Sequence, residues 1–280
     1  MLDQITPVLL TLNEAANISR TLESLSWARD IVVVDSYSRD GTRSIVESYS
    51  NTRCFQRGFD GHARQWNFAI HNTAIRTQWV LALDADHVPE VGLISELSCL
   101  SPGPDVCGYR IGFIYCVHGR PLHGSLYPPL VSLFRHQRAH YVQEGHTQRV
   151  QVGGKVEPLQ GRIRHDDRKP LGSWFNAQRR YLKLEVELIR TTPWRHLSWS
   201  NRLRRCVLPA PFVVLLWSLL VKGAILDGRA GLSYGFQRML VEFMLSLQLL
   251  LSWATQSSGR NFRDTTLAVG HDDNSGTKGP

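Results

Sequence analysis

The first hundred residues alternate between short apolar runs and stretches with helical spacing. Apolar, β-branched runs predict strands, and apolar positions spaced by three and four predict helices. The strand-like runs are residues 5–12, 31–34, 52–55 and 79–83, and the helical stretches are 14–26, about 42–49 and 61–73. This alternation predicts an α/β domain whose doubly wound sheet carries helices on both faces.

The pattern changes after residue 105. Short alternating runs between Gly/Pro turns predict added antiparallel strands up to about residue 165, which would wall one side of a site. Helical periodicity returns over residues 171–190. We therefore expect a catalytic-type domain over 1–190, a basic and apolar helical region for membrane association over 191–256, and a polar, disordered tail over 257–280.

The net charge is concentrated beside an apolar stretch. Residues 161–205 hold 12 of the 32 Lys/Arg residues and 4 of the 24 Asp/Glu residues, so this stretch accounts for the whole net charge of +8. Residues 206–221 follow at once and carry no charge. This arrangement predicts an anionic membrane surface as a partner, since each nearby Lys or Arg gains about 1 kcal/mol there.

The apolar segments are short for a membrane span. The uncharged cores within 206–221 and 239–254 each fall below the roughly 20 residues that cross a bilayer. We expect helices that lie in the membrane interface or re-enter it, with a spanning hairpin as the alternative. The expected location is the cytoplasmic face of the inner (plasma) membrane, either peripheral or with short membrane-inserted helices.

Composition and missing motifs exclude several classes. Apolar residues make up 42% and charged residues 20%, which excludes disorder as the main state. The five cysteines are odd in number and lack C-x-x-C spacing, which disfavours a disulfide framework or a thiolate zinc site. The absence of G-x-G-x-x-G after the first strand disfavours dinucleotide binding, and the absence of G-x-x-x-x-G-K-[ST] excludes a P-loop. The N-terminus has no secretory-signal pattern.

Polar clusters follow three of the predicted strands, and ligands in open α/β sheets bind beyond such strand ends. The clusters are Asn13-Glu14, Asp35-Ser36 and Asp84-Ala-Asp86. Asp84 and Asp86 would point the same way in an extended segment, and their hard oxygens suit Mg²⁺ or Mn²⁺, which in turn can hold a diphosphate. The alternative is that one of them caps the following helix.

Three further side chains could contact a nucleotide. The Asp35 carboxylate could accept hydrogen bonds from a nucleobase imide or a ribose hydroxyl, although Asp35 could also simply form a turn. Arg64 and Asn67 are three residues apart and would share one helical face, from which they could reach a base or a phosphate. A solvated surface arginine is the alternative for Arg64.

Together these residues resemble the family 2 glycosyltransferases with the GT-A fold, and more narrowly their bacterial branch of lipopolysaccharide-core β-glucosyltransferases. The resemblance covers about residues 3–190 and continues more weakly to about 253. The matching motifs are Thr11-Leu-Asn-Glu14, Ile31-Val-Val-Val-Asp35-Ser-x-Ser-x-Asp40-Gly-Thr42, Gly61-x-Ala-Arg64-x-x-Asn67-x-Ala-Ile70, Leu81-x-Leu-Asp84-Ala-Asp86 and Lys222-x-x-x-Leu-Asp227-Gly-x-x-Gly231.

The resemblance implies a nucleotide-sugar donor, with a UDP-sugar favoured, a divalent metal (Mg²⁺ or Mn²⁺), and inversion at the anomeric carbon. It also implies that Asp35 contacts the base, that Asp84 contacts the ribose or the metal, and that Asp86 is the main metal ligand. The other donor-binding candidates in these motifs are Thr11, Asn13, Glu14, Arg64 and Asn67.

An inverting transfer needs a general base for the acceptor hydroxyl. Glu144 occupies the stretch where the family has this carboxylate, although many members have a pair of acids there, and His146 is the alternative base. His165 is a candidate metal ligand or a surface histidine. Arg179 and Arg180 resemble part of the family's Gln-x-x-Arg-aromatic helix and could steady the leaving diphosphate, or they belong to the membrane-facing surface.

We therefore expect a metal-dependent inverting glycosyltransferase, specifically a hexosyltransferase, of lipopolysaccharide-core or related cell-envelope biosynthesis. Its acceptor would be a lipid-linked glycan. A polyprenyl-phosphate glycosyltransferase is the enzymatic alternative. The non-enzymatic alternatives are a membrane scaffold and a nucleic-acid binder, since residues 161–205 mix Arg with aromatic residues. We expect no nucleic-acid partner because the adjoining apolar segments favour lipid.

Overall fold

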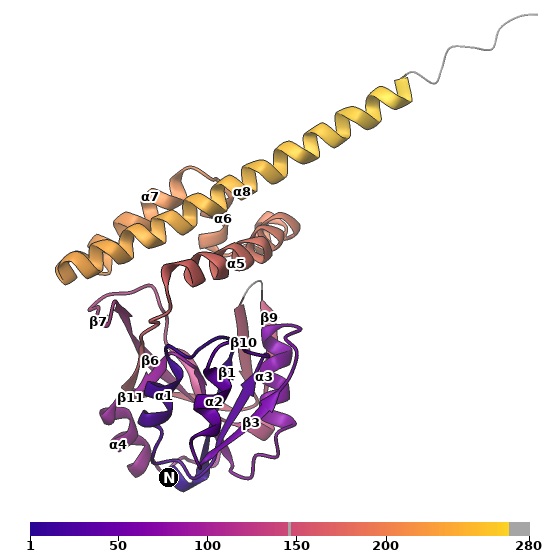
Figure 1. Cartoon of the computed structure of the whole chain (residues 1–280). Coiled ribbons are helices and arrows are strands. Elements are labelled where there is room, and N and C mark those ends of the chain that lie inside the picture. The colour runs from indigo at the N-terminus through magenta and orange to yellow at the C-terminus, as the bar shows by residue number, and fades with distance from the viewer. Residues whose placement is uncertain (145–146, 269–280) are drawn as a thin grey trace, which may run out of the picture.

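The computed structural model describes residues 1–144 and 147–268 and shows an α/β domain with helices gathered beyond one end of it (Figure 1). The strands are β1 (Ile5–Thr11), β2 (Ile31–Asp35), β3 (Thr52–Gln56), β4 (Trp79–Asp84), β5 (His87–Pro89), β6 (Val106–Val117), β7 (Arg120–Pro121), β8 (Leu130–Arg135), β9 (Ala139–Glu144), β10 (Thr147–Val152) and β11 (Lys155–His165). The helices are α1 (Ile18–Ser24), α2 (Thr42–Glu47), α3 (His62–His71), α4 (Val91–Cys99), α5 (Leu171–Thr191), α6 (Trp199–Arg205), α7 (Pro209–Leu216) and α8 (Gly228–Ala268). A π-helical segment, η4 (Trp217–Val221), and a 3₁₀ turn, η5 (Ala224–Asp227), lie between α7 and α8.

The main sheet is mixed. Its strand order is β3-β2-β1-β4-β8-β6-β11-β5, with β7 paired to β6, while β9 and β10 form a separate hairpin. The first four strands in this order are parallel, and β8 lies antiparallel to both β4 and β6. The expectation of only antiparallel added strands is wrong for β6 and β11, which pair in parallel. The chain can make this parallel return because β8, β9 and β10 separate the two strands and provide a long crossover.

Helices cover both faces of the sheet because side chains alternate along each strand. Ile5 and Leu9 of β1 enter a core that packs α1, α2 and α4. Val8, between them, enters a second core that packs α3 and β9. The predicted mixed α/β fold with helices on both faces and C-terminal helices is confirmed.

The register of the parallel strands places the predicted polar clusters at one edge. Thr11 lies opposite Asp35, and Leu10 lies opposite Asp84. Asn13 follows β1 with a left-handed φ of 56°, a conformation that Asn tolerates but helices exclude. The first helix therefore begins at Ile18 rather than at residue 14.

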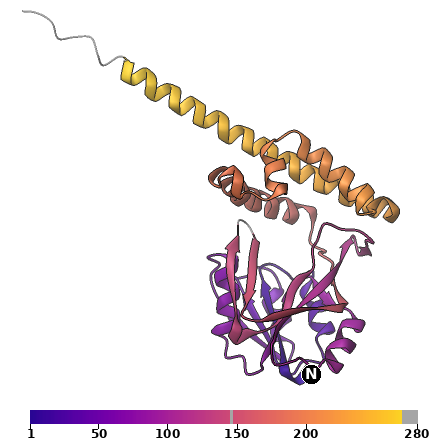
Figure 2. The ribbon, with the colours of Figure 1, turned by 180° about the vertical axis from the view of Figure 1, so that it is seen from behind.

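The C-terminal helices form a layer beyond the carboxyl edge of the sheet. Apolar side chains of α5 and α8 make a small core of their own, formed by Leu182, Val186, Ile189, Val241, Leu245 and Leu249. Both views show α7 lying beside α8 and α8 projecting past the other helices (Figures 1 and 2). The apolar C-terminal region is therefore a helical layer joined to the domain, as the sequence predicted.

Helix α8 is longer than the apolar pattern suggested. It runs to Ala268, so it enters the stretch from 257 that we expected to be a disordered tail, and residues 269–280 lie outside the described part of the chain. Extending an existing helix needs no new nucleation, which lets polar residues continue it. Among the described residues, no single helix has the length and hydropathy of a membrane span, while the pair Pro209–Val221 and Ala224–Ala254, bent by 73°, meets these criteria together.

Candidate functional site

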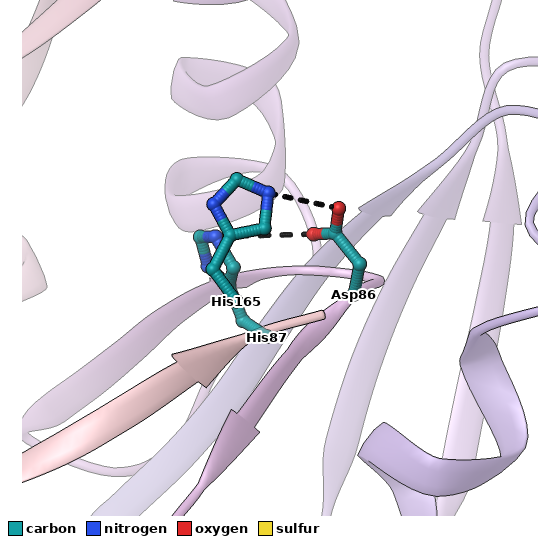
Figure 3. Close-up of side chains that lie close together, drawn as sticks. All are labelled: Asp86, His87 and His165. Atoms are coloured by element: carbon teal, nitrogen blue, oxygen red, sulfur yellow. Dashed lines mark hydrogen bonds and ion pairs between the residues drawn. The ribbon is translucent and has the colours of Figure 1, made fainter. Parts of the chain in front are cut away.

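One carboxylate and two imidazoles form a cluster at the carboxyl edge of β4. Asp86 lies in the turn between β4 and β5, His87 begins β5, and His165 ends β11. Antiparallel pairing of β5 with β11 places His87 opposite His165, so the sheet brings the two rings together. Figure 3 shows both rings beside the Asp86 carboxylate, and the ligand atoms of the three side chains lie within 4.8 Å of one another.

The distances distinguish a close pair from a more distant histidine. His165 Nε2 lies 3.1 Å from Asp86 Oδ2, whereas His87 Nε2 lies 3.8 Å from Asp86 Oδ1. The backbone N–H of Asp84 donates to His87 Nδ1 at 3.0 Å. In a neutral imidazole the accepting nitrogen carries no proton, so the proton of His87 is on Nε2. His87 therefore presents an N–H to the carboxylates rather than a lone pair to a metal.

The protonation preferences of these groups agree with this arrangement. Burial lowers the pKa of His87, which favours its neutral form. Burial opposes the charge on Asp86, yet His165, with further help from His87 and Lys169, holds the pKa of Asp86 below its ordinary value. Burial likewise opposes the charge on His165, but Asp86 raises the pKa of His165 overall. Asp86 is therefore ionised at neutral pH.

Asp84, Asp86 and His165 fit a divalent cation. Two ligands at right angles around Mg²⁺, each about 2.1 Å from the ion, are about 3.0 Å apart, and the Asp86–His165 separation is 3.1 Å. His165 Nδ1 is buried without a hydrogen-bond partner among the described residues. The Asp84 side chain is 48% exposed, and its Oδ2 lies 3.7 Å from His87 Nε2, the atom that Asp86 Oδ1 approaches to 3.8 Å, so Asp84 could add an oxygen ligand that solvent and a substrate can reach.

A polar network fixes a lysine beside this cluster. Lys169 Nζ donates to Glu14 at 2.6 Å, and Asn17 Nδ2 donates to Glu14 and to Asp167, both at 2.9 Å. Burial raises the pKa of Glu14 to about 7, against the opposing effect of Lys169. The charge of Lys169 also lowers the pKa of Asp86, which places this cation near the cluster. Glu14, predicted as a donor ligand, thus anchors a cation at the site.

Thr11, Asn13 and Asp35 shape the neighbouring loops. Thr11 Oγ1 donates to Asp35 Oδ1 at 2.8 Å, and the Ser38 backbone N–H donates to Asp35 Oδ2 at 2.9 Å. Asn13 Oδ1 accepts from the Arg39 N–H at 2.8 Å. Asp35 is only 1% exposed, so in this structure its carboxylate braces the loop after β2. Direct contact between Asp35 and a nucleobase stays a prediction.

Arg64 and Asn67 share α3, and each has a partner outside the metal-type cluster. Arg64 is 74% exposed and lies 3.7 Å from Asp60. Asn67 pairs with the backbone of Tyr141 in both directions, accepting from its N–H at 2.8 Å and donating to its C=O at 2.9 Å. Asn67 therefore joins α3 to β9, and its contact with a donor stays a prediction.

The arginines on α5 lie next to a residue that faces the site. Arg179 and Arg180 are exposed. Burial, with the Asp84 carboxylate as the next cause, raises the pKa of the following residue, Tyr181, so this face of α5 turns toward the cluster. The predicted diphosphate contacts of the two arginines remain untested.

The predicted base falls at the margin of the described chain. Glu144 is the last residue of β9, but its side chain lies outside the described residues, as does all of His146. Burial, with the Asp84 charge as a further cause, raises the pKa of Tyr141 on the same strand. The choice between Glu144 and His146 therefore stays a prediction.

Sequence reasoning missed an aromatic wall beside His165. The Tyr115 and Tyr127 rings both meet the His165 ring edge to face, at centroid distances of 4.9 and 4.8 Å. Phe113 packs on Tyr127 at 4.8 Å and on His87 at 5.0 Å. Alternation along β6 puts Phe113 and Tyr115 on one face, a signal present in the sequence, but nothing there ties Tyr127 to the same place.

Comparison with known proteins connects this site to a family. The family model described as Glycosyl transferase family 2 matches residues 8–143. One relative, the lipopolysaccharide core biosynthesis glycosyltransferase LpsC of Rhizobium meliloti (strain 1021), is 32% identical over 108 residues, which are 37% of this chain and 39% of LpsC. An uncharacterized glycosyltransferase of Rickettsia bellii (strain RML369-C) is 36% identical over 84 residues, 30% of this chain and 28% of that protein. The matches thus span well under half the length of these relatives.

Solved structures show weaker likeness. TarS 1-349 of S. aureus, in complex with UDP-GlcNAc, has 15% identity, a TM-score of 0.47, and an alignment covering 87% of this chain and 81% of that chain. Glucosyl-3-phosphoglycerate synthase of Mycobacterium tuberculosis, in complex with Mn²⁺, UDP and glucosyl-3-phosphoglycerate, has 17% identity, a TM-score of 0.43, and coverage of 66% and 79%.

Proposed function

Because the family model described as Glycosyl transferase family 2 matches residues 8–143, we propose that the chain transfers a sugar from a nucleotide-sugar donor to a glycan acceptor of the lipopolysaccharide core or a related cell-envelope glycan. The observation that carries this proposal is the Asp86–His165 pair beside the exposed Asp84, at the edge where the parallel strands end. A UDP-sugar is the favoured donor, and a lipid-linked glycan is the proposed acceptor.

The proposed chemistry divides the work among a few side chains. Asp84, Asp86 and His165 would hold Mg²⁺ or Mn²⁺, which would neutralise charge on the leaving nucleoside diphosphate. An imidazole ligand favours Mn²⁺ of the two. Lys169 lies near the same place, held by Glu14, and adds positive charge toward the leaving group.

The transfer is proposed to invert the anomeric carbon. The acceptor oxygen forms a new bond to the anomeric carbon, while the bond between this carbon and the diphosphate oxygen breaks on the opposite face. Glu144 is proposed to take the proton of the acceptor hydroxyl. The acceptor is proposed to approach between the Glu144 end of β9 and the aromatic wall, which borders His165.

We also propose that the enzyme works at the cytoplasmic face of the inner membrane, seated through an apolar face of α7 and α8. Besides the stripe that packs on α5, α8 carries a second apolar stripe that is exposed. The residues of this exposed stripe recur every three or four positions: Leu232, Phe236, Leu240, Phe243, Leu247, Leu250. The segment of α7 and η4 carries another, spaced by four: Leu208, Phe212, Leu216, Leu220. The two stripes adjoin, since the Phe212 and Phe243 rings are 5.5 Å apart.

Charge supports a lipid partner for this apolar face. Exposed Lys222 lies between α7 and α8, exposed Arg229 is the second residue of α8, and exposed Arg195 lies in the segment before α6. Burying one such Leu or Phe would contribute about 1.5–3 kcal/mol, and each nearby cation about 1 kcal/mol on an anionic surface. An apolar face bordered by cations suits an anionic bilayer better than a second copy of the same cationic face.

Vesicle flotation tests the membrane proposal. We expect the full chain to float with phosphatidylcholine vesicles containing 30% phosphatidylglycerol, and less with pure phosphatidylcholine. Leu216→Ser combined with Leu220→Ser and Phe236→Ser should abolish flotation. Val91→Ser, which changes an apolar residue on α4 that is more exposed than these three, is the control and should float like the wild type. Absence of flotation would reject a lipid partner. So would light scattering that shows the wild type to be a dimer without vesicles and the triple variant to be a monomer.

A transfer assay tests the reaction. Radiolabelled UDP-, GDP- and dTDP-sugars are offered with Mn²⁺ and either truncated lipopolysaccharide core or a polyprenyl phosphate. We expect label in the core acceptor from one donor, and loss of transfer in Glu144→Ala and Asp86→Ala. Transfer only to the polyprenyl phosphate, unaffected by Glu144→Ala, would replace the proposed acceptor with the alternative one. No transfer of any sugar by the folded protein would count against the enzymatic proposal.

A further inference from the structure

The segment between β7 and β8 is held by the C-terminal helices. The His123 backbone N–H donates to both carboxylate oxygens of Asp227, at 3.0 and 3.1 Å. The Leu126 N–H donates to the Tyr234 hydroxyl at 2.7 Å. Asp227 ends η5 and Tyr234 lies in the second turn of α8, so side chains about a hundred residues away bind the amides of this irregular segment.

The glycines of the Lys222–Gly231 motif explain how Asp227 reaches that position. Gly223 and Gly228 bracket η5 with left-handed φ angles of 73° and 58°. A Cβ on Gly231 would lie 1.6 Å from the Ala224 carbonyl oxygen, so only glycine lets η5 fold onto the first turn of α8. A Cβ on Gly124 would lie 1.5 Å from the Lys222 carbonyl oxygen, so the segment also presses directly against this turn.

The held segment ends in the aromatic wall of the site. Tyr127, one residue past Leu126, meets the His165 ring edge to face at 4.8 Å. The Tyr234 ring also packs on Tyr115 at 5.2 Å, and Tyr115 is the second ring of the wall that meets His165, at 4.9 Å. His165 is thus oriented toward Asp86 by two tyrosines, and each of them depends on the C-terminal helices.

We propose that Asp227 and Tyr234 are positioning residues for the metal site. By holding residues 122–127 they keep Tyr127 and Tyr115 against His165, so that His165 Nε2 faces Asp86. This inference rests on the proposed function, because it takes His165 as a metal ligand. It assigns a role to the Lys222–Gly231 motif and makes the same helices serve both the membrane face and the site.

Two variants and one matched control test this inference. Asp227→Ala removes both acceptors of the His123 amide, and Tyr234→Phe removes a single oxygen, which keeps the test open if the first variant folds poorly. Glu96→Ala is the control, because the Glu96 carboxylate likewise accepts from two backbone amides, those of Gln160 and Gly161, at 3.0 and 2.7 Å. Glu96 lies on α4, and the two amides that it binds lie outside the aromatic wall.

The readouts are hydrogen exchange and Mn²⁺ titration by calorimetry. We expect faster exchange of the peptide containing residues 122–127 in both variants. Removing such supporting contacts typically weakens a metal site by roughly 10- to 100-fold, so we expect a rise of about tenfold in the Mn²⁺ dissociation constant for Asp227→Ala. Glu96→Ala should quicken exchange around Gly161 and leave Mn²⁺ affinity unchanged.

The outcomes separate this inference from the function on which it rests. Wild-type Mn²⁺ binding with unchanged affinity in both variants overturns the positioning role alone. A wild-type protein that binds no Mn²⁺ overturns the proposed metal site, and this inference with it. An equal loss of affinity in Glu96→Ala would reduce the effect to general destabilisation and would also overturn the inference.

Discussion

A buried ion pair in the helical layer gives a sharp stability prediction. Arg204 on α6 approaches Glu242 on α8 with Nη2 at 2.7 Å and Nε at 3.1 Å, and its Nη1 lies 3.3 Å from Glu185 on α5. The Glu242 side chain is 1% exposed. Arg204→Met would leave two carboxylates without their shared cation, one of them fully buried, so we expect a loss of about 3–5 kcal/mol in unfolding free energy.

Thermal and urea unfolding in detergent would measure this loss. For a chain of this size we expect the melting temperature to fall by about 10 °C in Arg204→Met. Replacing both partners, as Arg204→Met with Glu242→Leu, should recover most of the loss because no unpaired charge remains on Glu242. Arg43→Met, at an exposed pair with Glu47, is the control and should leave the midpoint unchanged. A single variant as stable as the wild type would refute the reasoning that Glu242 depends on this cation.

Two further changes address the site and the motif beside it. Glu14 has a folded-state pKa of about 7 against an ordinary 4.5, so the folded state binds the proton more tightly than the unfolded state does. The unfolding free energy of the wild type relative to Glu14→Gln should therefore fall by about 3 kcal/mol between pH 4.5 and 7.5 and be flat outside that window. A difference that does not depend on pH would contradict this. Gly231→Ala should lower the unfolding free energy by about 3 kcal/mol because its Cβ would overlap the Ala224 carbonyl. The control Gly92→Ala places its Cβ in open space and should raise the unfolding free energy by about 0.5 kcal/mol. Equal effects of the two variants would disprove the close approach of Gly231 to Ala224.

Local patterns predicted the sheet edge of this site well. Apolar runs that stop at a polar residue located β1, β2 and β4, and parallel pairing then had to bring their ends together, as the opposition of Thr11 and Asp35 shows. Asp84 and Asp86 could be recognised because they follow a buried apolar run, but the structure places only Asp84 on β4 and puts Asp86 in the following turn, not in the extended segment that we expected. The metal role of these residues is supported by the geometry of Asp86 with His165 and stays a proposal.

Contacts between distant segments could not be predicted in the same way. Glu14 and Lys169 are 155 residues apart in the sequence, and only the folded chain shows that one holds the other. Asn67 carries a family motif, yet the structure uses its amide to bind the backbone of β9. The parallel pairing of β6 with β11 was also missed, because alternation marks a strand but does not give the direction of its neighbour.

Calorimetric nucleotide binding tests the central proposal most directly. UDP, GDP, dTDP and CMP would be titrated into the detergent-solubilised chain with and without Mn²⁺, using the wild type and Asp86→Ala. The account predicts Mn²⁺-dependent binding of one nucleotide, UDP by preference, that is lost in Asp86→Ala while Glu96→Ala retains it. A folded wild type that binds none of the four nucleotides in either condition would contradict the proposed donor site.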